Sequence, residues 1–381
     1  MAKAPTVYDV AERAGVSIAT VSMTFRRPHK VKEETRKLVE AAAAELNYVP
    51  SASARGLAHG HTGALGLYAY DVFLPEPDEA LGTTVGAGTR SRATVPVVRE
   101  DRDDYRRFPL YVHEVQRGVE LECWQRGYAL LIGGGSQADG ATRVTDIVGR
   151  VDGLALFPDH SLPADVLERI ARAKPVVAVS QRPQDDGLST VSVDNRGGMR
   201  AMTEHLLVEH RMRDLLFVGY MNTFDAQERF AGFKSALRAA GLRVPSKPAE
   251  LVGDHQVETV VADVLARDAL PEAFVCVSDE IALDLMKALG ERGVRVPEQV
   301  AVTGFDGVVA GRIVRPALTT VRQPMQAMGR AVVDILLERI ADPAGAPIAR
   351  RLPVQVVVRE SCGCSRVASE LARVEGGGRR G

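Results

Sequence analysis

Six basic side chains gather within twelve residues near the N-terminus of the chain. They are Arg26, Arg27, Lys30, Lys32, Arg36 and Lys37. Residues 1–60 carry nine Lys/Arg and six Asp/Glu, a net charge of +3, whereas the rest of the chain carries −4. Clustered cations suit phosphate groups, because binding releases the counterions of a nucleic acid. Such a run is also common on a solvated face, so the elements around it must decide between the two interpretations.

The segment before this basic run predicts two short helices joined by a tight turn. Thr6 and Asp9 have the spacing of a capping box. Gly15 accepts the left-handed conformation that ends a helix, and Ser17 can cap the next helix, from which Val21 would face the first. The apolar stripe of the first helix is formed by Val7, Val10, Ala11 and Ala14. Such a helix-turn-helix places its second helix in the major groove of DNA. The alternative is a small alanine-rich helical cap with no role on DNA.

A third helix and a linker follow. Residues 32–35 open the helix, Asn47 is suited to a left-handed C-terminal cap, and Pro50 prevents continuation. The side chains expected on its buried side are Leu38, Val39, Ala42, Ala43 and Leu46. Residues 51–60, SASARGLAHG, have the small-residue composition of a linker.

Bulk properties predict a soluble protein of two or three domains. The chain has 381 residues, 45% of them hydrophobic and 25% charged. No apolar run reaches the roughly 18 residues that a membrane span needs, and the N-terminus lacks the apolar core of a signal peptide. Four cysteines do not form a disulfide framework in so long a chain. We therefore expect a cytoplasmic protein with no membrane partner.

Enzyme motifs are absent from the sequence. Residues 133–136 read GGGS but lack the spacing of a phosphate-binding loop, and we expect these glycines to turn the chain out of a strand. No HExxH motif, nucleophile elbow or paired zinc spacing occurs. Cys362 and Cys364 alone cannot complete a tetrahedral zinc site, and Cys123 and Cys276 are expected in the core. The sequence implies no metal, no cofactor and no enzyme activity.

From residue 63 onward, apolar runs alternate with amphipathic helical segments. The expected strands are residues 64–70, 129–132, 153–157, 175–179, 215–218, 273–277 and 300–303. The expected helices are residues 111–126, 163–173, 198–210, 227–240, 257–267 and 280–292. Continuous apolar strands between helices predict parallel sheets covered on both faces, in two doubly wound subdomains with a cleft between them.

Two motifs carry a resemblance to a known family. VYDVAERAGVSIATVS (residues 7–22) and TRKLVEAAAAELNYVPSASARGLA (residues 35–58) resemble the lactose-repressor (LacI) family of bacterial transcription regulators, and the resemblance extends along nearly the whole chain. The chain resembles an actinobacterial-type member with an insertion in the first sensor loop. The resemblance implies an all-α helix-turn-helix head followed by an α/β two-lobed core like that of periplasmic binding proteins.

The resemblance assigns roles in the head. Ser17 to Thr24 corresponds to the recognition helix, with Ile18, Ala19 and Met23 facing base edges. The residues assigned to phosphate contacts are Tyr8, Ser17, Thr20 and Ser22. Met23 stands where many members have Arg, and Arg26 where they have Asn, so we expect thymine methyl contacts or groove shape to outweigh hydrogen bonding to guanine. Leu57 corresponds to a leucine that wedges into the minor groove when two subunits meet on DNA. Simple docking of Leu57 onto the core is the alternative.

The same resemblance predicts the domain boundaries. They are residues 1–50 for the head, 51–61 for a hinge helix, and 62–365 for the core, followed by a disordered tail at 366–381. Within the core, an N-subdomain takes about 62–192 and 324–351, and a C-subdomain about 193–322 and 353–365. Crossings between them are expected near residues 190–194, 320–325 and 350–354. Residues 72–107 form an insertion that is either disordered or a lid over the cleft.

The resemblance also places an effector site in the cleft. Arg229, in AQERFAGF, can hold two hydroxyls or a carboxylate, and Asp306, in AVTGFDG, can accept ligand protons. The other candidates are Asp71, Phe108, Tyr111, Ser180 and Ser278. Asp279 is interpreted as the cap of the helix that begins at Glu280, with direct contact to the ligand as the alternative. An alternative for Arg229 and Asp306 is a salt bridge across the closed cleft.

These features together predict a homodimeric repressor of the LacI family. Its partners would be double-stranded operator DNA and a small-molecule effector, expected to be a sugar or sugar derivative, although relatives that bind nucleobases use the same positions. Binding of the effector would change the affinity for DNA allosterically. The alternative is a two-lobed solute receptor or an enzyme on the same body, without DNA regulation. A secretion signal would support the receptor and a reactive triad the enzyme, and the sequence has neither.

Overall fold

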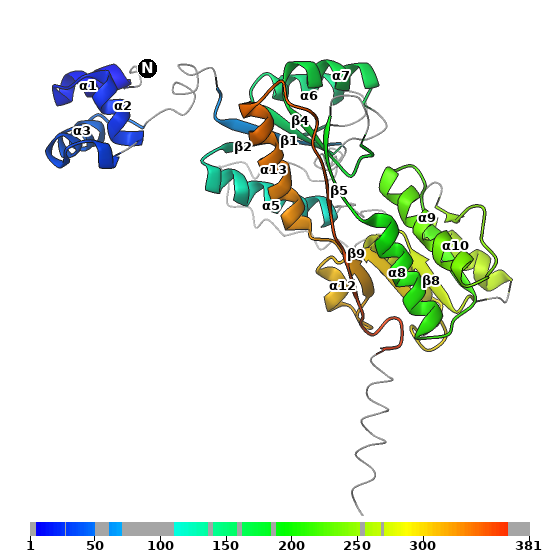
Figure 1. Ribbon diagram of the computed structural model, residues 1–381. Helices are drawn as coiled ribbons and strands as arrows, with labels where there is room; N and C mark the ends of the chain where they lie inside the picture. Colours follow the sequence, from blue (N-terminus) through cyan, green and yellow to red (C-terminus); the bar gives the residue numbers. More distant parts are fainter. Residues whose placement is uncertain are drawn as a thin grey trace, which may run out of the picture. The chain divides into compact units, whose positions relative to one another are not determined.

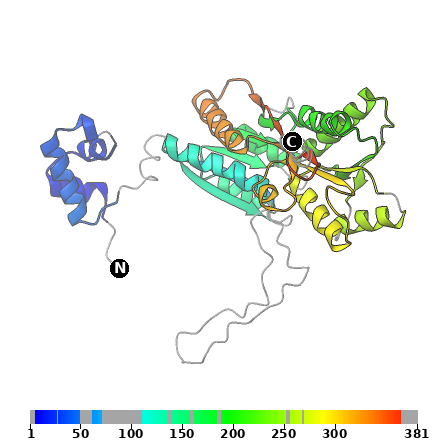
Figure 2. The same cartoon turned by 90° about the horizontal axis from the view of Figure 1, so that it is seen from below.

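The computed structural model describes residues 5–26, 28–49, 61–70, 110–135, 140–157, 162–183, 188–251, 256–267 and 270–364. The chain divides into two compact units, Met1–Gly63 and Ala64–Gly381 (Figures 1 and 2). The expected hinge (residues 51–60), the insertion (72–107) and the tail (366–381) lie outside the described residues.

Three α-helices form a domain within the described residues of the first unit. They are α1 (Val7–Ala14), α2 (Ile18–Arg26) and α3 (Glu33–Glu45), with a short 3-10 helix η1 (Pro28–Lys30) between the last two. The backbone N–H and hydroxyl of Thr6 both donate to Asp9, at 2.6 and 2.7 Å, and Gly15 ends α1 with φ 66°. Val10, Val21 and Val39 are fully buried where the three helices meet. The predicted helix-turn-helix is confirmed.

The described strands of the second unit form two six-stranded sheets, the first of which is entirely parallel. Its strand order is β11-β5-β4-β3-β1-β2. The strands are β1 (Ala64–Tyr70), β2 (Ala129–Gly135), β3 (Gly153–Phe157), β4 (Val176–Val179), β5 (Ser189–Val193) and β11 (Ala349–Leu352). Helices α5 (Leu110–Arg126) and α13 (Met325–Ala341) cover one face, and α6 (Gly140–Val148) and α7 (Ala164–Ala173) the other. Leu65 and Leu67 point to the first face and Tyr68 to the second, as the alternation of a strand requires. We call this sheet and its helices the N-terminal lobe.

The second sheet has the order β12-β10-β9-β8-β6-β7. Its strands are β6 (Leu215–Gly219), β7 (Ala249–Glu250), β8 (Ala273–Cys276), β9 (Ala301–Asp306), β10 (Thr319–Arg322) and β12 (Gln355–Val357). Helices α8 (Asn195–Val208) and α9 (Phe224–Ala239) pack together on one side of the sheet, with α10 (Gln256–Ala266) and α11 (Asp279–Glu291) on the other (Figure 2). The short helix α12 (Ala310–Ile313) follows β9. Only β12 runs antiparallel to its neighbour within these described strands. We call this sheet and its helices the C-terminal lobe.

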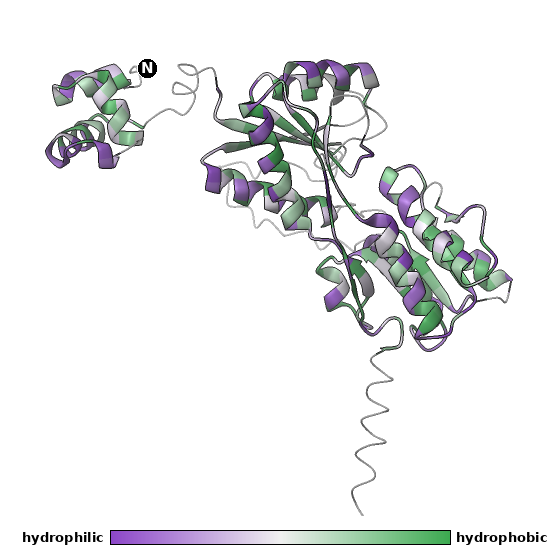
Figure 3. Ribbon diagram, viewed as in Figure 1, coloured by the Kyte–Doolittle hydropathy of each residue, from purple (hydrophilic) through white to green (hydrophobic). Residues whose placement is uncertain are grey.

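The chain passes between the two lobes three times. It leaves the first sheet after β5 and enters α8, returns after β10 into α13, and leaves again between β11 and β12 (Figure 1). The central strands are apolar along their length, and the outward faces of the helices are hydrophilic (Figure 3). Every residue of β3 and β9 is buried, because helices cover both faces of each sheet.

Three details differ from the sequence analysis. Leu38, expected on the buried side of α3, is 58% exposed, since the apolar face of this helix turns toward Val39, Ala42 and Ala43. The glycines at 133–135 do not turn the chain out of β2 but belong to the strand. There Gly133 leaves room for Ile147 of α6: a β-carbon at Gly133 would lie 2.0 Å from Ile147 Cδ1. Helix α13, which covers the centre of the first sheet, was not among the expected helices, and neither were α6 and the short α12.

Candidate functional site

The surface of the head expected to read DNA is centred on α2. Ile18 and Met23 are 41% and 42% exposed, and Ala19 is also exposed, although apolar residues of this size usually turn inward. Tyr8 of α1 is 67% exposed. Val21, on the opposite side of α2, is fully buried. The helix therefore presents an apolar outer face while its inner face anchors it to the other two helices.

Hydroxyl groups and basic side chains border that face. The Ser17 hydroxyl accepts the backbone N–H of Thr20 at 3.1 Å and lies 2.9 Å from the Thr20 hydroxyl, so both are held at the start of α2. A shallow hollow beside α2 is lined by Ser17, Ala19, Thr20 and Met23 together with Lys30 and Lys32. Ser22 is half-buried. Arg26 is the last residue of α2, and Leu57 lies outside the described residues.

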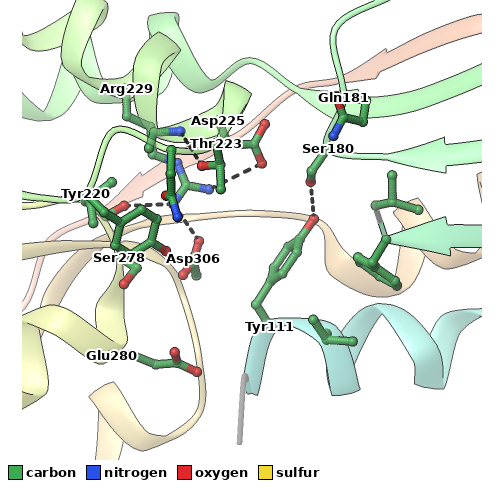
Figure 4. A pocket seen from close by; sticks show the side chains of 16 residues that line it. Tyr111, Ser180, Gln181, Tyr220, Thr223, Asp225, Arg229, Ser278, Glu280 and Asp306 are labelled. Atoms are coloured by element: carbon green, nitrogen blue, oxygen red, sulfur yellow. Dashed lines mark hydrogen bonds and ion pairs between the residues drawn. The ribbon is translucent and has the colours of Figure 1, made fainter. Parts of the chain in front are cut away.

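A cavity of about 290 Å³ lies between the two lobes. From the N-terminal lobe it is lined by Tyr111, Val112, Phe157, Val179, Ser180 and Gln181. From the C-terminal lobe it is lined by Tyr220, Asn222, Thr223, Asp225, Ala226, Arg229, Val277, Ser278, Glu280 and Asp306. Figure 4 shows the two sets of side chains facing each other, with Tyr111 and Ser180 on one side and Arg229, Asp225 and Asp306 on the other. Five of the seven expected effector residues thus line one cavity. The other two, Asp71 and Phe108, lie outside the described residues.

Arg229 is the most heavily bonded group of the cavity wall. Its Nε donates to Asn195 Oδ1 at 2.8 Å and its Nη1 to the carbonyl oxygen of Val277 at 2.7 Å. Nη1 also lies 3.2 Å from Asp306 Oδ1, and the guanidinium stacks on Phe305 with its carbon 3.9 Å from the ring centre. The ion pair with Asp306 exists, but both residues belong to the C-terminal lobe. It therefore does not bridge the cleft.

Two buried carboxylates share this one guanidinium. Asp225, on α9, lies 3.8 Å from Arg229 Nη2 and accepts a hydrogen bond from Asn195 at 2.7 Å. Burial raises the pKa of Asp225, although Arg229 opposes the shift. Burial likewise raises the pKa of Asp306 to about 7, against the attraction of Arg229. Because one guanidinium cannot compensate two desolvated carboxylates, the cluster of Asp225, Arg229 and Asp306 favours retaining a proton near neutral pH.

Both walls of the cavity contain a residue with an unusual backbone conformation. Ser180, at the end of β4, has φ 60°, and Asp306, at the end of β9, has φ 129°. Non-glycine residues rarely adopt positive φ, and such conformations concentrate at binding sites. The Ser180 hydroxyl is within 2.8 Å of the Tyr111 hydroxyl, which orients the tyrosine across the opening (Figure 4). The carboxyl ends of two parallel sheets therefore meet here, where doubly wound folds bind ligands.

The start of α11 differs from the sequence analysis in the residue that caps it. Ser278 is the N-cap, since its hydroxyl accepts the N–H of Ile281 at 3.3 Å. Asp279, the expected cap, is the first residue of the helix and fully buried. Its carboxylate accepts the backbone N–H groups of Gly307 and Val308 and the Thr320 hydroxyl. Asp279 thus positions the loop after Asp306 and does not line the cavity.

Glu280 connects the two lobes. Its carboxylate, on α11 of the C-terminal lobe, accepts the N–H of Leu110 at 2.7 Å. Leu110 is the first residue of α5 in the N-terminal lobe, where unpaired N–H groups and the helix dipole favour an anion. Asp225, Asn195 and Glu280 were not singled out from the sequence. The Asp in FDAQERF, one helical turn before Arg229, was the available signal for Asp225.

The architecture is that of a helix-turn-helix head joined in one chain to a two-lobed ligand-binding core. The model of bacterial regulatory proteins of the lacI family matches residues 6–51, and that of the periplasmic binding protein-like domain matches residues 203–362. Among curated proteins, the HTH-type transcriptional repressor PurR of Salmonella arizonae is 32% identical over 348 residues, 88% of this chain and 91% of its own. The ribose operon repressor of Escherichia coli K12 is 29% identical over 89% of this chain and 94% of its own.

Solved structures agree along the chain. The lac repressor bound to ONPG in its repressed state is 25% identical, with a TM-score of 0.71 over 94% of this chain and 100% of that one. The complex of the transcriptional regulator CelR with cellobiose is 27% identical, with a TM-score of 0.62 over 94% and 99%.

This chain belongs to the LacI family of bacterial regulatory proteins. It is a DNA-binding repressor of that family with an effector-binding core, and not an enzyme. Within the part of the chain that the structure describes, no helix is long and apolar enough to cross a membrane.

Proposed function

We propose that this repressor releases its operator when a neutral, sugar-like effector binds between the lobes. The observation that carries the proposal is the buried cluster of Asp225, Arg229 and Asp306 in the wall of the cavity between the lobes. In the proposed arrangement, the lobes follow the boundaries expected from the sequence, with residues 62–192 and 324–351 on one side and 193–322 and 353–365 on the other.

The charge of the cavity favours a neutral ligand. Among the described residues that line it, three carboxylates, from Asp225, Glu280 and Asp306, stand against the single guanidinium of Arg229. An anionic effector such as a sugar phosphate would meet net repulsion, whereas carboxylates accept the protons of sugar hydroxyls well. The volume of about 290 Å³ lies near the lower end of ligand pockets, roughly 300–1,000 Å³, which suits a monosaccharide.

The shape of the aromatic surface favours a sugar over a nucleobase. Tyr111 and Phe157 meet edge to face, with ring centres 6.2 Å apart and planes at 89°. They form a corner and not the two parallel walls between which a flat base stacks. The names of two relatives, a ribose operon repressor and a regulator bound to cellobiose, agree with this class of ligand.

Lobe closure provides the coupling to DNA. The contact between Glu280 and the N-terminus of α5 links the lobes at the rim of the cavity. A ligand in the cavity would change this contact and the closure of the lobes, and with it the spacing of two hinges that include Leu57. We expect a reciprocal coupling of about 1–3 kcal/mol between effector and operator.

On DNA, α2 would enter the major groove with Ile18, Ala19 and Met23 against base edges. The exposed apolar face of α2 favours contacts with thymine methyl groups, while Tyr8, Ser17, Thr20, Ser22 and Arg26 would hold phosphates or replace lost polar contacts. Leu57 would insert into the minor groove. A twofold protein requires a near-palindromic operator.

The homodimer would bury apolar side chains that are exposed in the single chain. They include Trp124 and Ile132 on the N-terminal lobe and Val309 and Ile313 on the C-terminal lobe. Trp124 is the only tryptophan of the chain and is 78% exposed, so its emission reports the association directly. We expect a blue shift with rising protein concentration, and a monomer in sedimentation for Ile313→Asp. A monomeric wild type at micromolar concentration would contradict the dimer.

The decisive experiment identifies the operator first and the ligand second. DNA retained from random fragments by the full chain should contain a near-palindrome. Ribose, glucose, galactose, cellobiose, ribose 5-phosphate, adenine and guanine are then titrated into the operator complex. The proposal expects one neutral sugar to weaken binding at least fivefold and to lose this effect in Arg229→Met. If a sugar phosphate or a base acts instead, the neutral-sugar assignment is wrong, and if the active ligand tightens binding, the release mechanism is wrong.

A further inference from the structure

Two histidines and two cysteines meet on the C-terminal lobe, away from the effector cavity. His205 lies in the last turn of α8, and His210 follows two residues after that helix ends. Cys362 and Cys364 lie in the turn that follows β12 at the C-terminal end of the described chain. One ligand atom from each side chain lies within 4.8 Å of those of the other three.

Three sulfur–nitrogen distances within this cluster are close to the edges of a tetrahedral metal site. His205 Nε2 lies 3.7 Å from Cys362 Sγ and 3.5 Å from Cys364 Sγ, and His210 Nε2 lies 3.1 Å from Cys364 Sγ. Zinc bonds of about 2.3 Å to sulfur and about 2.05 Å to nitrogen place these atoms about 3.6 Å apart in a tetrahedron. These three distances differ from that value by about 0.5 Å at most, and the other three pairs lie within 4.8 Å. Shifts of about 1 Å therefore suffice for the four side chains to enclose an ion.

The local backbone brings the four side chains together. The histidines are five residues apart, within the spacing common in structural zinc sites. Their rings are nearly perpendicular, at 81° with centres 5.1 Å apart. The two cysteines are separated only by Gly363, which has φ 95° and whose N–H donates to the carbonyl oxygen of Glu360 at 2.8 Å. This left-handed turn is what allows so short a spacing to direct both sulfurs to one point.

The neighbouring groups support a thiolate ligand. The Thr319 hydroxyl donates to Cys362 Sγ at 3.2 Å and itself accepts the N–H of Arg359 at 2.9 Å. Hydrogen bonds of this kind orient the ligands of a metal and stabilise the thiolate form. Two thiolates neutralise a divalent ion, and a set of two sulfurs and two imidazoles selects zinc over magnesium or calcium.

We propose that His205, His210, Cys362 and Cys364 bind one zinc ion in a structural site. The ion would attach the C-terminal end of α8 to the turn that follows β12, the strand that the chain forms after its third passage between the lobes. Asn195, which holds Arg229, lies ten residues before His205 on α8, about 15 Å along the helix axis. The metal site is thus separate from the effector cavity, and its role is to anchor the chain end on the C-terminal lobe.

Metal analysis of the full chain tests the proposal. The protein is purified under reducing conditions without chelator from cells supplied with zinc. We expect about one zinc per chain by mass spectrometry, and Co²⁺ exchange should produce the visible bands of a tetrahedral site with a thiolate charge-transfer band in the near ultraviolet. Cys364→Ser and His210→Gln should each lose the zinc, whereas the controls Cys123→Ser and His113→Gln should keep it. A chelator should lower the melting temperature of the wild type and of the controls but not of the two site variants.

Three results would overturn the proposal. The first is a wild type that holds no zinc and shows no tetrahedral Co²⁺ spectrum. The second is a disulfide between Cys362 and Cys364 in the reduced preparation. The third is zinc retained in full by both single variants, Cys364→Ser and His210→Gln. The Co²⁺ spectrum of the wild type distinguishes a tetrahedral thiolate site from its absence even if the variants fail to fold.

Discussion

Replacement of Arg229 by methionine tests the electrostatics of the effector cavity most directly. Methionine fills much of the space that the Arg229 side chain occupies but leaves Asp225 and Asp306 without a cation. The guanidinium also makes two short hydrogen bonds, to Asn195 and to the carbonyl oxygen of Val277. Breaking a buried ion pair from one side costs about 3–5 kcal/mol, and we expect a loss of unfolding free energy in this range at pH 8.

The pH dependence of this loss has a definite sign. An unfolded Asp has a pKa of about 3.9, whereas burial raises that of Asp306 to about 7 in the folded chain. The folded state therefore binds more protons between these values, and stability falls as the pH rises through this window. Without Arg229 the pKa values of both carboxylates rise further, so the deficit of Arg229→Met should be larger at pH 8 than at pH 5.

Urea unfolding followed by circular dichroism at the two pH values measures this difference. Arg238→Met, an exposed position on the same helix, is the matched control and should change stability by no more than about 0.5 kcal/mol. Adding Asp306→Asn to Arg229→Met should recover part of the loss, chiefly at pH 8. A deficit for Arg229→Met below about 1 kcal/mol and equal at both pH values would refute the shared-guanidinium reasoning.

Three further predictions concern the cavity, the head and the first sheet. A neutral sugar that donates a hydroxyl hydrogen bond to Asp306 should bind more tightly as the pH rises from 6 to 8, by up to about tenfold per pH unit below pH 7. Calorimetry measures this affinity. If Asp306→Asn leaves the pH dependence unchanged, another group causes it. Met23→Arg should create a preference for guanine at one position of each operator half, with a difference in binding free energy of roughly 1–3 kcal/mol from the other bases in a random-sequence selection. An unchanged base preference would show that Met23 does not face the bases. Gly133→Ala should lower the free energy of unfolding by about 1–3 kcal/mol, since the new methyl group meets Ile147 Cδ1. Adding Ile147→Val to Gly133→Ala should restore most of this loss. Equal losses in the single and the double variant would locate the strain elsewhere.

The head was predictable from the sequence because its determinants are local. A capping box from Thr6 to Asp9, a left-handed Gly15 and a buried Val21 act over one or two helical turns, and each appears in the structure as expected. Leu38 shows the limit of this reasoning: it fits the apolar period of α3, but which side of a helix is buried depends on the neighbouring helices.

The alternation of apolar strands and amphipathic helices was sufficient to predict two parallel sheets. It did not reveal α13, which begins just after the chain has returned from the C-terminal lobe. Nor did it show that β2 continues through three glycines, because that depends on Ile147 of α6 filling the space above Gly133.

The sequence by itself determined the class of the protein: a head that binds DNA, two doubly wound lobes, and Arg229 and Asp306 as polar candidates for the effector site. Only the tertiary structure decided which charges share a cavity, and it added Asp225, Asn195 and the link from Glu280 to α5. It also brought His205 and His210 to within bonding range of Cys362 and Cys364, some 150 residues away along the chain. The physical reason is that helix caps and apolar periods act between neighbours in sequence, whereas a buried charge or a metal ion is satisfied only by groups that folding brings together.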